Sequence, residues 1–197
     1  MSIAIIDSGG ANIASLRFAL QRLQAESELT RDPRVLQTAS HVLLPGVGAA
    51  ADAMTRLREA GLESVIPRLT QPVLGICLGM QLLFADSAEG DVDCLGIIDG
   101  RVEPLAGGPD LTIPHMGWNQ ISRSGDCKLM DGLDDGEYFY FVHSYAAAEG
   151  PATRAVSEHG ERFSAIVGRD NFHGTQFHPE RSGAAGARVL RNFLESG

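Results

Sequence analysis

A cysteine framed by two glycines is the first feature of this chain that could perform chemistry. Cys77 lies in the segment GICLG at residues 75–79, directly after an apolar run that begins at Val73. A nucleophile on a sharp strand-to-helix turn needs small neighbours, because larger side chains would collide with the turn. A helix beginning after Cys77 would bring unpaired N–H groups and its positive dipole end to the thiol, which favours the thiolate. The pattern predicts that Cys77 is an activated nucleophile.

A histidine and a glutamate two positions apart supply the partners that such a nucleophile needs. His178 precedes a proline, which favours extended backbone, and residues two apart in an extended segment project to the same side. Glu180 can therefore bind one ring nitrogen of His178 and leave the other free to exchange a proton with the thiol. A cysteine and a histidine taken at random are more often structural. The glycine frame and the His-Pro-Glu order favour a catalytic triad of Cys77, His178 and Glu180.

The elements that must position this triad are visible in the hydrophobic pattern of the first half. Continuous apolar runs at residues 3–6, 42–44 and 73–76 predict buried strands. Helical patterns follow the first two runs, and a helix start is expected directly after the third. Buried strands that alternate with amphipathic helices indicate a parallel sheet covered on both faces, with ligands bound beyond the carboxyl ends of its strands.

The second half has a different character. Ser182 offers an N-cap for a closing helix whose apolar side runs to Leu194. Before that helix, turns rich in Gly, Asp and Pro separate shorter expected strands at residues 97–98, around 102, and at 138–142, 153–156, 163–167 and 175–177. We therefore expect an α/β fold with a mostly parallel central sheet flanked by helices and an antiparallel addition in the second half, as a single domain over residues 1–197.

Composition limits the class of protein. The chain has 197 residues, 44% of them hydrophobic and 21% charged, as in one globular domain with a full core. A formal charge of −9 and scattered lysines and arginines argue against a nucleic-acid partner. No apolar stretch approaches the length of a bilayer span, and no basic targeting segment opens the chain, so we expect a cytoplasmic protein without membrane contact.

Two further patterns argue against a cofactor. The cysteines, Cys77, Cys94 and Cys127, are widely spaced without a CxxC pair, which indicates free thiols rather than disulfides or a zinc site. The segment GVG at residues 46–48 lacks the third glycine of a dinucleotide fingerprint, and no P-loop motif occurs. We expect no metal and no cofactor.

Five motifs make the chain resemble a class I (triad-type) glutamine amidotransferase, and within that family the glutaminase subunits of imidazole glycerol phosphate synthases. They are PGVG at residues 45–48, GICLGMQ at 75–81, PHMGWN at 114–119, FVHSY at 141–145 and QFHPE at 176–180. The resemblance spans essentially the whole length. It implies that Cys77 hydrolyses L-glutamine through a glutamyl thioester. It also implies that the ammonia passes to a (β/α)₈ cyclase subunit, in a heterodimer that makes imidazole glycerol phosphate and an aminoimidazole carboxamide ribotide in histidine biosynthesis.

The resemblance also assigns roles to residues that would otherwise be read as ordinary. Alone, PGVG would be a tight turn, Gln81 a solvated helix residue and Trp118 a core residue. By resemblance, the backbone N–H groups of Val47 and Leu78 form an oxyanion hole, and the glycines around Val47 would let its peptide turn over on activation. Gly48, Gln81, Ser144 and Tyr145 would bind the substrate. The partner interface would include Asn12, Trp118, Asn119, Tyr140 and Arg181; no chemistry is assigned to His115 or His143.

Two departures and three alternatives accompany this interpretation. The opening turn, DSGGAN at residues 7–12, does not have the aromatic residue and glycine that the family usually places just before the asparagine, and Arg181 replaces a common lysine. A stand-alone cysteine hydrolase, such as a gamma-glutamyl hydrolase, would have no use for a partner-facing Trp118. An inactive scaffold subunit would have no chemical reason to keep the triad. The anthranilate, guanylate and carbamoyl phosphate amidotransferases are not expected to carry PHMGWN.

Overall fold

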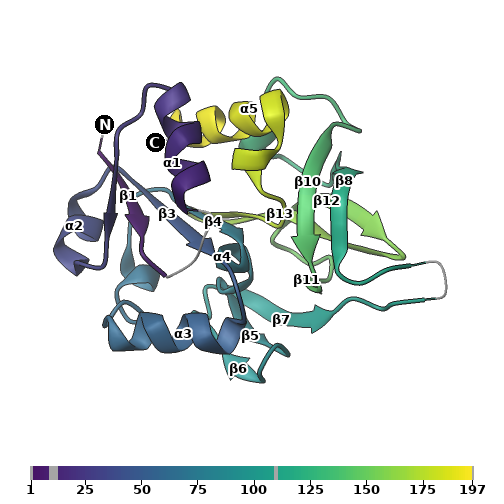
Figure 1. Ribbon diagram of the computed structural model, residues 1–197, viewed down its shortest axis with the longest axis horizontal. Helices are drawn as coiled ribbons and strands as arrows, with labels where there is room; N and C mark the ends of the chain where they lie inside the picture. The colour runs from purple at the N-terminus through teal and green to yellow at the C-terminus, as the bar shows by residue number, and fades with distance from the viewer. Residues whose placement is uncertain (1, 9–12, 109–110, 197) are drawn as a thin grey trace.

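The computed structural model describes residues 2–8, 13–108 and 111–196 (Figure 1). Asn12, one of the expected interface residues, lies outside these ranges. Among the described residues, no helix is long and apolar enough to span a bilayer.

Eight strands form the main sheet in the order β2-β1-β3-β4-β14-β13-β12-β9. The pairs from β2 to β14 are parallel, and those from β14 to β9 are antiparallel. The fold class expected from the sequence is therefore confirmed, including its antiparallel addition in the second half. The strands are β1 (Ile3–Ile6), β2 (Ser27–Thr30), β3 (His41–Gly46), β4 (Val73–Cys77), β9 (Ser122–Arg123), β12 (Thr153–His159), β13 (Glu161–Arg169) and β14 (Phe172–Thr175).

Two smaller sheets pack beside the main one. A four-stranded sheet has the order β11-β7-β5-β6, and an antiparallel ribbon pairs β8 with β10. In the ribbon, Trp118 lies opposite Tyr140. Their strands are β5 (Phe84–Ser87), β6 (Val92–Asp93), β7 (Ile98–Pro104), β8 (His115–Gln120), β10 (Tyr138–His143) and β11 (Tyr145–Ala147).

Helices cover both faces of the main sheet. In Figure 1, α1 and α5 lie on one side of it and α3 on the other. Leu43 and Leu74 face a core built with α1, α5 and the β8–β10 ribbon, whereas Val42 and Leu44 face a core built with α2, α3 and the four-stranded sheet. The helices are α1 (Ile13–Arg22), α2 (Pro33–Thr38), α3 (Ala50–Glu59), α4 (Leu78–Gln81) and α5 (Gly183–Leu194), with 3₁₀ turns at Ile66–Arg68, Lys128–Met130 and Pro179–Arg181.

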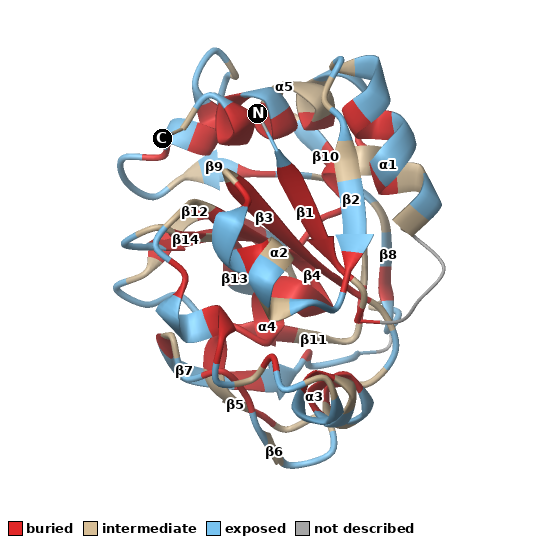
Figure 2. Cartoon of the chain, turned by 90° about the vertical axis from the view of Figure 1, so that its left-hand side faces the viewer, coloured by how far each residue is buried: buried red, intermediate tan, exposed pale blue. Residues whose placement is uncertain are grey.

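Burial on both faces explains the uninterrupted apolar runs of β1, β3 and β4. In Figure 2 these strands are buried, while the helices expose their outer sides. Consecutive residues of one strand, such as Ile5 and Ile6, enter different cores, so neither position tolerates a polar side chain.

Three local expectations differ from the structure. The helix after Cys77 is a single turn, because the carbonyls of Leu82 and Leu83 accept N–H groups from the segment at residues 95–98 instead of continuing the helix. The last strand ends at Thr175 rather than Phe177. Ser182 precedes α5 but makes no capping bond, since its hydroxyl donates to the His178 carbonyl and accepts the Tyr140 N–H.

Candidate active site

Cys77 lies on a strained turn between β4 and α4. Its backbone has φ 55° and ψ −113°, a region that non-glycine residues rarely occupy. This is the strand-to-helix turn that the sequence predicts, and it presents the thiol at the carboxyl end of β4.

Neighbouring glycines make room for this turn. A Cβ atom on Gly79 would lie 1.7 Å from the Leu44 carbonyl oxygen, and one on Gly75 would lie 2.5 Å from the Gly79 carbonyl oxygen. Both contacts involve backbone atoms, which have little freedom to move. The glycines are therefore required because β3, β4 and α4 approach each other at backbone distance.

Substituting Gly79 by alanine should destabilise the protein by about 3 kcal/mol or more, since overpacking against backbone exceeds ordinary core strain. Urea unfolding of the variant measures this. Gly125→Ala is the matched control, because nothing lies within 4 Å of its added Cβ; its effect should stay within about 0.5 kcal/mol. Equal stability of the two variants would contradict this account of the turn.

His178 and Glu180 are brought together by the turn that follows β14. His178 Nδ1 lies 2.8 Å from Glu180 Oε1, and both side chains are buried. The turn is fastened to β10, because the His178 N–H donates to the Tyr140 carbonyl at 2.9 Å. Within the described residues, Glu180 Oε2 is buried without a hydrogen-bond partner, so the carboxylate directs its interactions to the imidazole.

The imidazole also interacts with the thiol. Burial lowers the pKa of His178, but hydrogen bonds and charge interactions with Cys77 and Glu180 outweigh burial and raise the pKa to about 10. A histidine with this environment is protonated at neutral pH. The three residues expected to form a triad thus lie in one contact chain with the electrostatics that nucleophilic attack needs.

A cavity of about 340 Å³ opens over the thiol. This is within the range of small-molecule sites. Its lining includes all the expected oxyanion and substrate residues, as well as Glu89 and His143, which the sequence analysis did not assign to the site. The lining residues are Gly46, Val47, Gly48, Cys77, Leu78, Gln81, Glu89, Pro114, Val142, His143, Ser144, Tyr145 and His178.

Gln81 is held at this cavity by its amide nitrogen. Gln81 Nε2 donates to the Tyr145 carbonyl at 2.8 Å and to Gln176 Oε1 at 2.9 Å. Both amide hydrogens are thereby used, which leaves Gln81 Oε1 as an acceptor. The Tyr145 carbonyl also receives His143 Nδ1 at 2.9 Å, so both its lone pairs are occupied and a ligand can use only other groups of Tyr145.

Glu89 is the charged group that the sequence analysis missed. Its carboxylate accepts the Ala50 N–H at 2.9 Å and lines the cavity. Burial raises the pKa of Glu89, and the charge of Asp52 adds to this effect, against the hydrogen bond from Ala50. Glu89 lies twelve positions after Cys77, with strand β5 between them. No sequence motif has this spacing, so Glu89 could not be found from the sequence.

The expected interface residues lie mostly on the outer face of the β8–β10 ribbon. The Trp118 and Tyr140 rings meet edge to face with centroids 6.2 Å apart, and the Arg181 guanidinium lies 4.3 Å from the Tyr140 centroid. Asn119 points away from this face, because neighbouring residues of a strand alternate. Its amide nitrogen lies 3.2 Å from His115 Nε2 and 2.8 Å from the Glu158 carbonyl oxygen.

The sequence matches the family described as glutamine amidotransferase class-I over residues 4–196. It is 51% identical over 193 residues to the imidazole glycerol phosphate synthase subunit HisH of Xanthomonas campestris pv. campestris, covering 98% of this chain and 96% of that relative. It is 52% identical over 196 residues to the HisH subunit of Escherichia coli, covering 99% of this chain and 100% of that relative.

Solved structures resemble the fold at lower identity. One described as a glutamine amidotransferase has a TM-score of 0.76 at 20% identity, covering 98% of this chain and 97% of that one. PurLQS from Thermotoga maritima has a TM-score of 0.72 at 18% identity, with coverage of 98% and 97%. These structures support the fold alone.

Proposed function

Since this chain belongs to the class-I glutamine amidotransferase family, we propose that it is the glutaminase subunit of an imidazole glycerol phosphate synthase and delivers ammonia directly to a cyclase subunit. Glutamine hydrolysis in histidine biosynthesis follows from the family and from relatives at 51% and 52% identity over nearly their whole length. The (β/α)₈ fold of the partner and the direct passage of ammonia are the finer parts of the proposal. The observation that carries the chemistry is the contact chain Cys77–His178–Glu180 at the cavity.

The proposed reaction has two displacement steps. The Cys77 thiolate attacks the carbon of the glutamine side-chain amide, and the imidazolium of His178 gives its proton to the leaving nitrogen, so the C–N bond breaks and ammonia departs. Water then attacks the thioester, with His178 accepting a proton. The C–S bond breaks, which releases glutamate and restores Cys77. Glu180 keeps the imidazole oriented throughout.

Negative charge on the former amide oxygen must be stabilised in both steps. The proposed donors are the N–H groups of Leu78 and Val47, whose residues line the cavity beside Cys77. One such donor contributes roughly 3–4 kcal/mol to lowering a barrier. Gly48 has φ +87°, so the peptides around Val47 sit next to a residue free of the usual steric limits. We propose that partner binding rotates this segment to supply the Val47 N–H.

Recognition of glutamine would use polar groups of the cavity lining other than the triad and the oxyanion donors. The Glu89 carboxylate is suited to the substrate α-ammonium, because among the described residues it is the acidic side chain that lines the cavity. Gln81 Oε1 accepts a further N–H from the substrate. Gly48, Ser144 and Tyr145 would contact its backbone-like end through their remaining polar groups, as the family resemblance implies.

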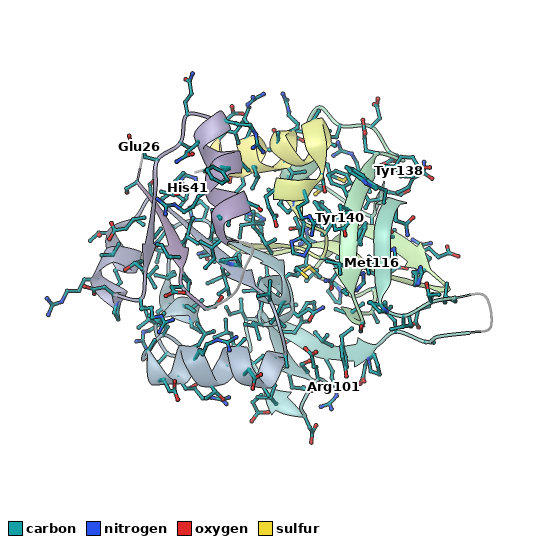
Figure 3. All side chains as sticks on the ribbon, viewed as in Figure 1. Glu26, His41, Arg101, Met116, Tyr138 and Tyr140 are labelled. Atoms are coloured by element: carbon teal, nitrogen blue, oxygen red, sulfur yellow. The ribbon has the colours of Figure 1, made fainter. Side chains whose placement is uncertain are left out.

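The outer face of the β8–β10 ribbon is the proposed docking surface for the cyclase subunit. Met116 is 63% exposed, Trp118 55% and Tyr138 53%. In Figure 3 Met116, Tyr138 and Tyr140 lie along this ribbon, on the side of the molecule away from the helix labelled α2 in Figure 1. Aromatic residues, methionine and arginine are enriched at protein interfaces, and Arg181 adds the cation to this surface.

Trp118→Ala should weaken association with the cyclase by about 2 kcal/mol or more, roughly 30-fold in Kd, if the ring is a buried anchor of the complex. Calorimetric titration measures the change. Leu29→Ala is the control, because Leu29 is an exposed apolar residue at 39% on the opposite edge strand. An unchanged Kd for the Trp118 variant would show that Trp118 is not part of the docking surface.

Paired kinetics test the proposed function. Glutamine hydrolysis is measured for the chain alone, with the cyclase, and with the cyclase and its nucleotide substrate. The expected result is low activity alone and strong stimulation by the loaded partner, because uncoupled hydrolysis would lose ammonia to the solvent. Strong hydrolysis by the isolated chain, unchanged by the partner, would instead favour the stand-alone cysteine hydrolase.

A further inference from the structure

One continuous hydrogen-bond network joins the docking strand β8 to the nucleophile. On the inner face of β8, Asn119 Nδ2 lies 3.2 Å from His115 Nε2. His115 Nδ1 lies 2.9 Å from His143 Nε2, and His143 Nδ1 lies 2.9 Å from the Tyr145 carbonyl oxygen. This first half of the network crosses from the ribbon to the cavity.

The second half runs from the cavity to the thiol. The Tyr145 carbonyl also accepts Gln81 Nε2, which donates its other hydrogen to Gln176 Oε1. Gln176 Nε2 then lies 3.8 Å from Cys77 Sγ, a distance suited to a hydrogen bond to sulfur. A donor at this place orients the sulfur within the cavity. Gln176 therefore links the substrate-holding amide of Gln81 to the nucleophile itself.

In the first half of the network, the groups at its two ends determine which atom donates in each hydrogen bond. Asn119 Nδ2 is an amide nitrogen and can only donate hydrogen bonds. His115 Nε2 is therefore the acceptor, and His115 Nδ1 bears the proton. His143 Nε2 must then accept, and His143 Nδ1 donates to the carbonyl, which can only accept. Both rings are therefore neutral Nδ1–H tautomers, and protonating either one would set two donors against each other.

The surroundings keep both rings in this state. His115 is 5% exposed and His143 6%. Burial lowers the pKa of His115 to about 4, with the charge of His159 adding to the effect. Burial likewise lowers the pKa of His143 to about 3, against its bond to the Tyr145 carbonyl. The rings pack tightly as well, since His115 stacks on His159 at 4.2 Å and on Phe141 at 5.0 Å between centroids.

We propose that this network is a positioning device through which contact of the cyclase with β8 is transmitted to the Gln81 amide and the Cys77 thiol. Asn119, His115 and Gln176 act as positioning residues that touch neither the substrate nor the partner's ligand. His143 lines the cavity and acts as a positioning residue through its bonds to His115 and the Tyr145 carbonyl. The inference rests on the proposed function for its partner, whereas the bond directions rest on geometry alone. A shift of β8 changes the position of Asn119. Because the groups of the network are buried and each hydrogen bond has a fixed donor and acceptor, they cannot change partners, and the next group must move as well.

The tautomers provide a test that needs no activity. Long-range ¹H–¹⁵N spectra of the full chain should show His115 and His143 as Nδ1–H tautomers at pH 7. Finding either ring as an Nε2–H tautomer would overturn the network as drawn. In His115→Phe, which keeps the ring stacking but removes both nitrogens, His143 should lose its single tautomer. In His159→Phe, which replaces the ring stacked on His115 outside the network, His143 should keep it.

A double-mutant cycle tests the coupling in the complex with loaded cyclase. His115→Phe should lower kcat/KM for glutamine roughly two- to twelve-fold, the effect of losing the one neutral hydrogen bond that leads to His143 and the cavity, while His159→Phe leaves it unchanged. Gln176→Met should lower kcat/KM for glutamine by a smaller factor in the His115→Phe background than in the wild type. Additive effects of the two changes would overturn the coupling. A wild-type complex without glutaminase activity would contradict the proposed function instead, and the tautomer measurement would then decide the network by itself.

Discussion

Cys77→Ala should abolish glutamine-dependent synthesis by the complex while ammonia added to the medium still supports it. Removing the nucleophile of a triad costs roughly 10⁶-fold in kcat in a well-studied serine protease, and no second thiol is found among the described residues that line the cavity. The alanine side chain leaves the strained turn and its glycine contacts in place, so the fold and the docking surface should survive. Steady-state kinetics with glutamine and with ammonium salt as alternative nitrogen donors measure both halves of the expectation.

Cys94→Ala is the matched control for that experiment. Burial raises the pKa of Cys94 to about 11, with nearby carboxylates adding to the effect, so this thiol is protonated and inert at neutral pH. Its replacement should leave both reactions unchanged. Glutamine-dependent turnover retained by Cys77→Ala would exclude Cys77 as the nucleophile, and loss of the ammonia-dependent reaction would show that the substitution damages the complex rather than the chemistry.

Local sequence patterns could predict the core strands and the place of the three residues proposed as a triad. Strands β1, β3 and β4 are buried on both faces, so their apolar runs are continuous and unmistakable. The turn at Cys77 requires glycines for steric reasons that hold in any context. The His-Pro-Glu order places a carboxylate beside an imidazole through backbone geometry alone.

Other elements have no such local pattern. Strand β2 is an edge strand with exposed Glu28 and Leu29, so its residues lack both an apolar run and a clean alternation. The segment after Cys77 looks helical, yet its carbonyls pair with residues 95–98, which are distant in sequence. Strand β8 alternates in burial, but its inner positions are histidine, glycine and asparagine rather than apolar residues.

The polar network could not be predicted because it is made by tertiary contacts. His115 and His143 are 28 positions apart, and Gln81 and Gln176 are 95 apart. Isolated histidines and glutamines are ordinary in sequence, and only the antiparallel register of β8 with β10, which sets His115 opposite His143, brings the first pair together. The same holds for Glu89, whose role depends on the turn between β5 and β6.

Glu180→Gln should lower glutaminase kcat by up to roughly 10⁴-fold, as the equivalent change does in a serine-protease triad, and less than His178→Ala does. The amide keeps the size of the side chain but cannot stabilise the imidazolium. Among the described residues, no other carboxylate contacts His178 and could take over this role.

The pH profile distinguishes this mechanism from a loss of folding. In the wild type, the raised pKa of His178, about 10, keeps the imidazole protonated until strongly alkaline pH. The imidazolium is lost as pH rises through the pKa of the folded state, so lowering that pKa by removing the carboxylate should move the alkaline limb of kcat/KM to lower pH. Glu28→Gln, at an exposed position on β2, should leave both kcat and the profile unchanged. A Glu180→Gln enzyme with the wild-type rate and alkaline limb would reduce the triad to a dyad of Cys77 and His178.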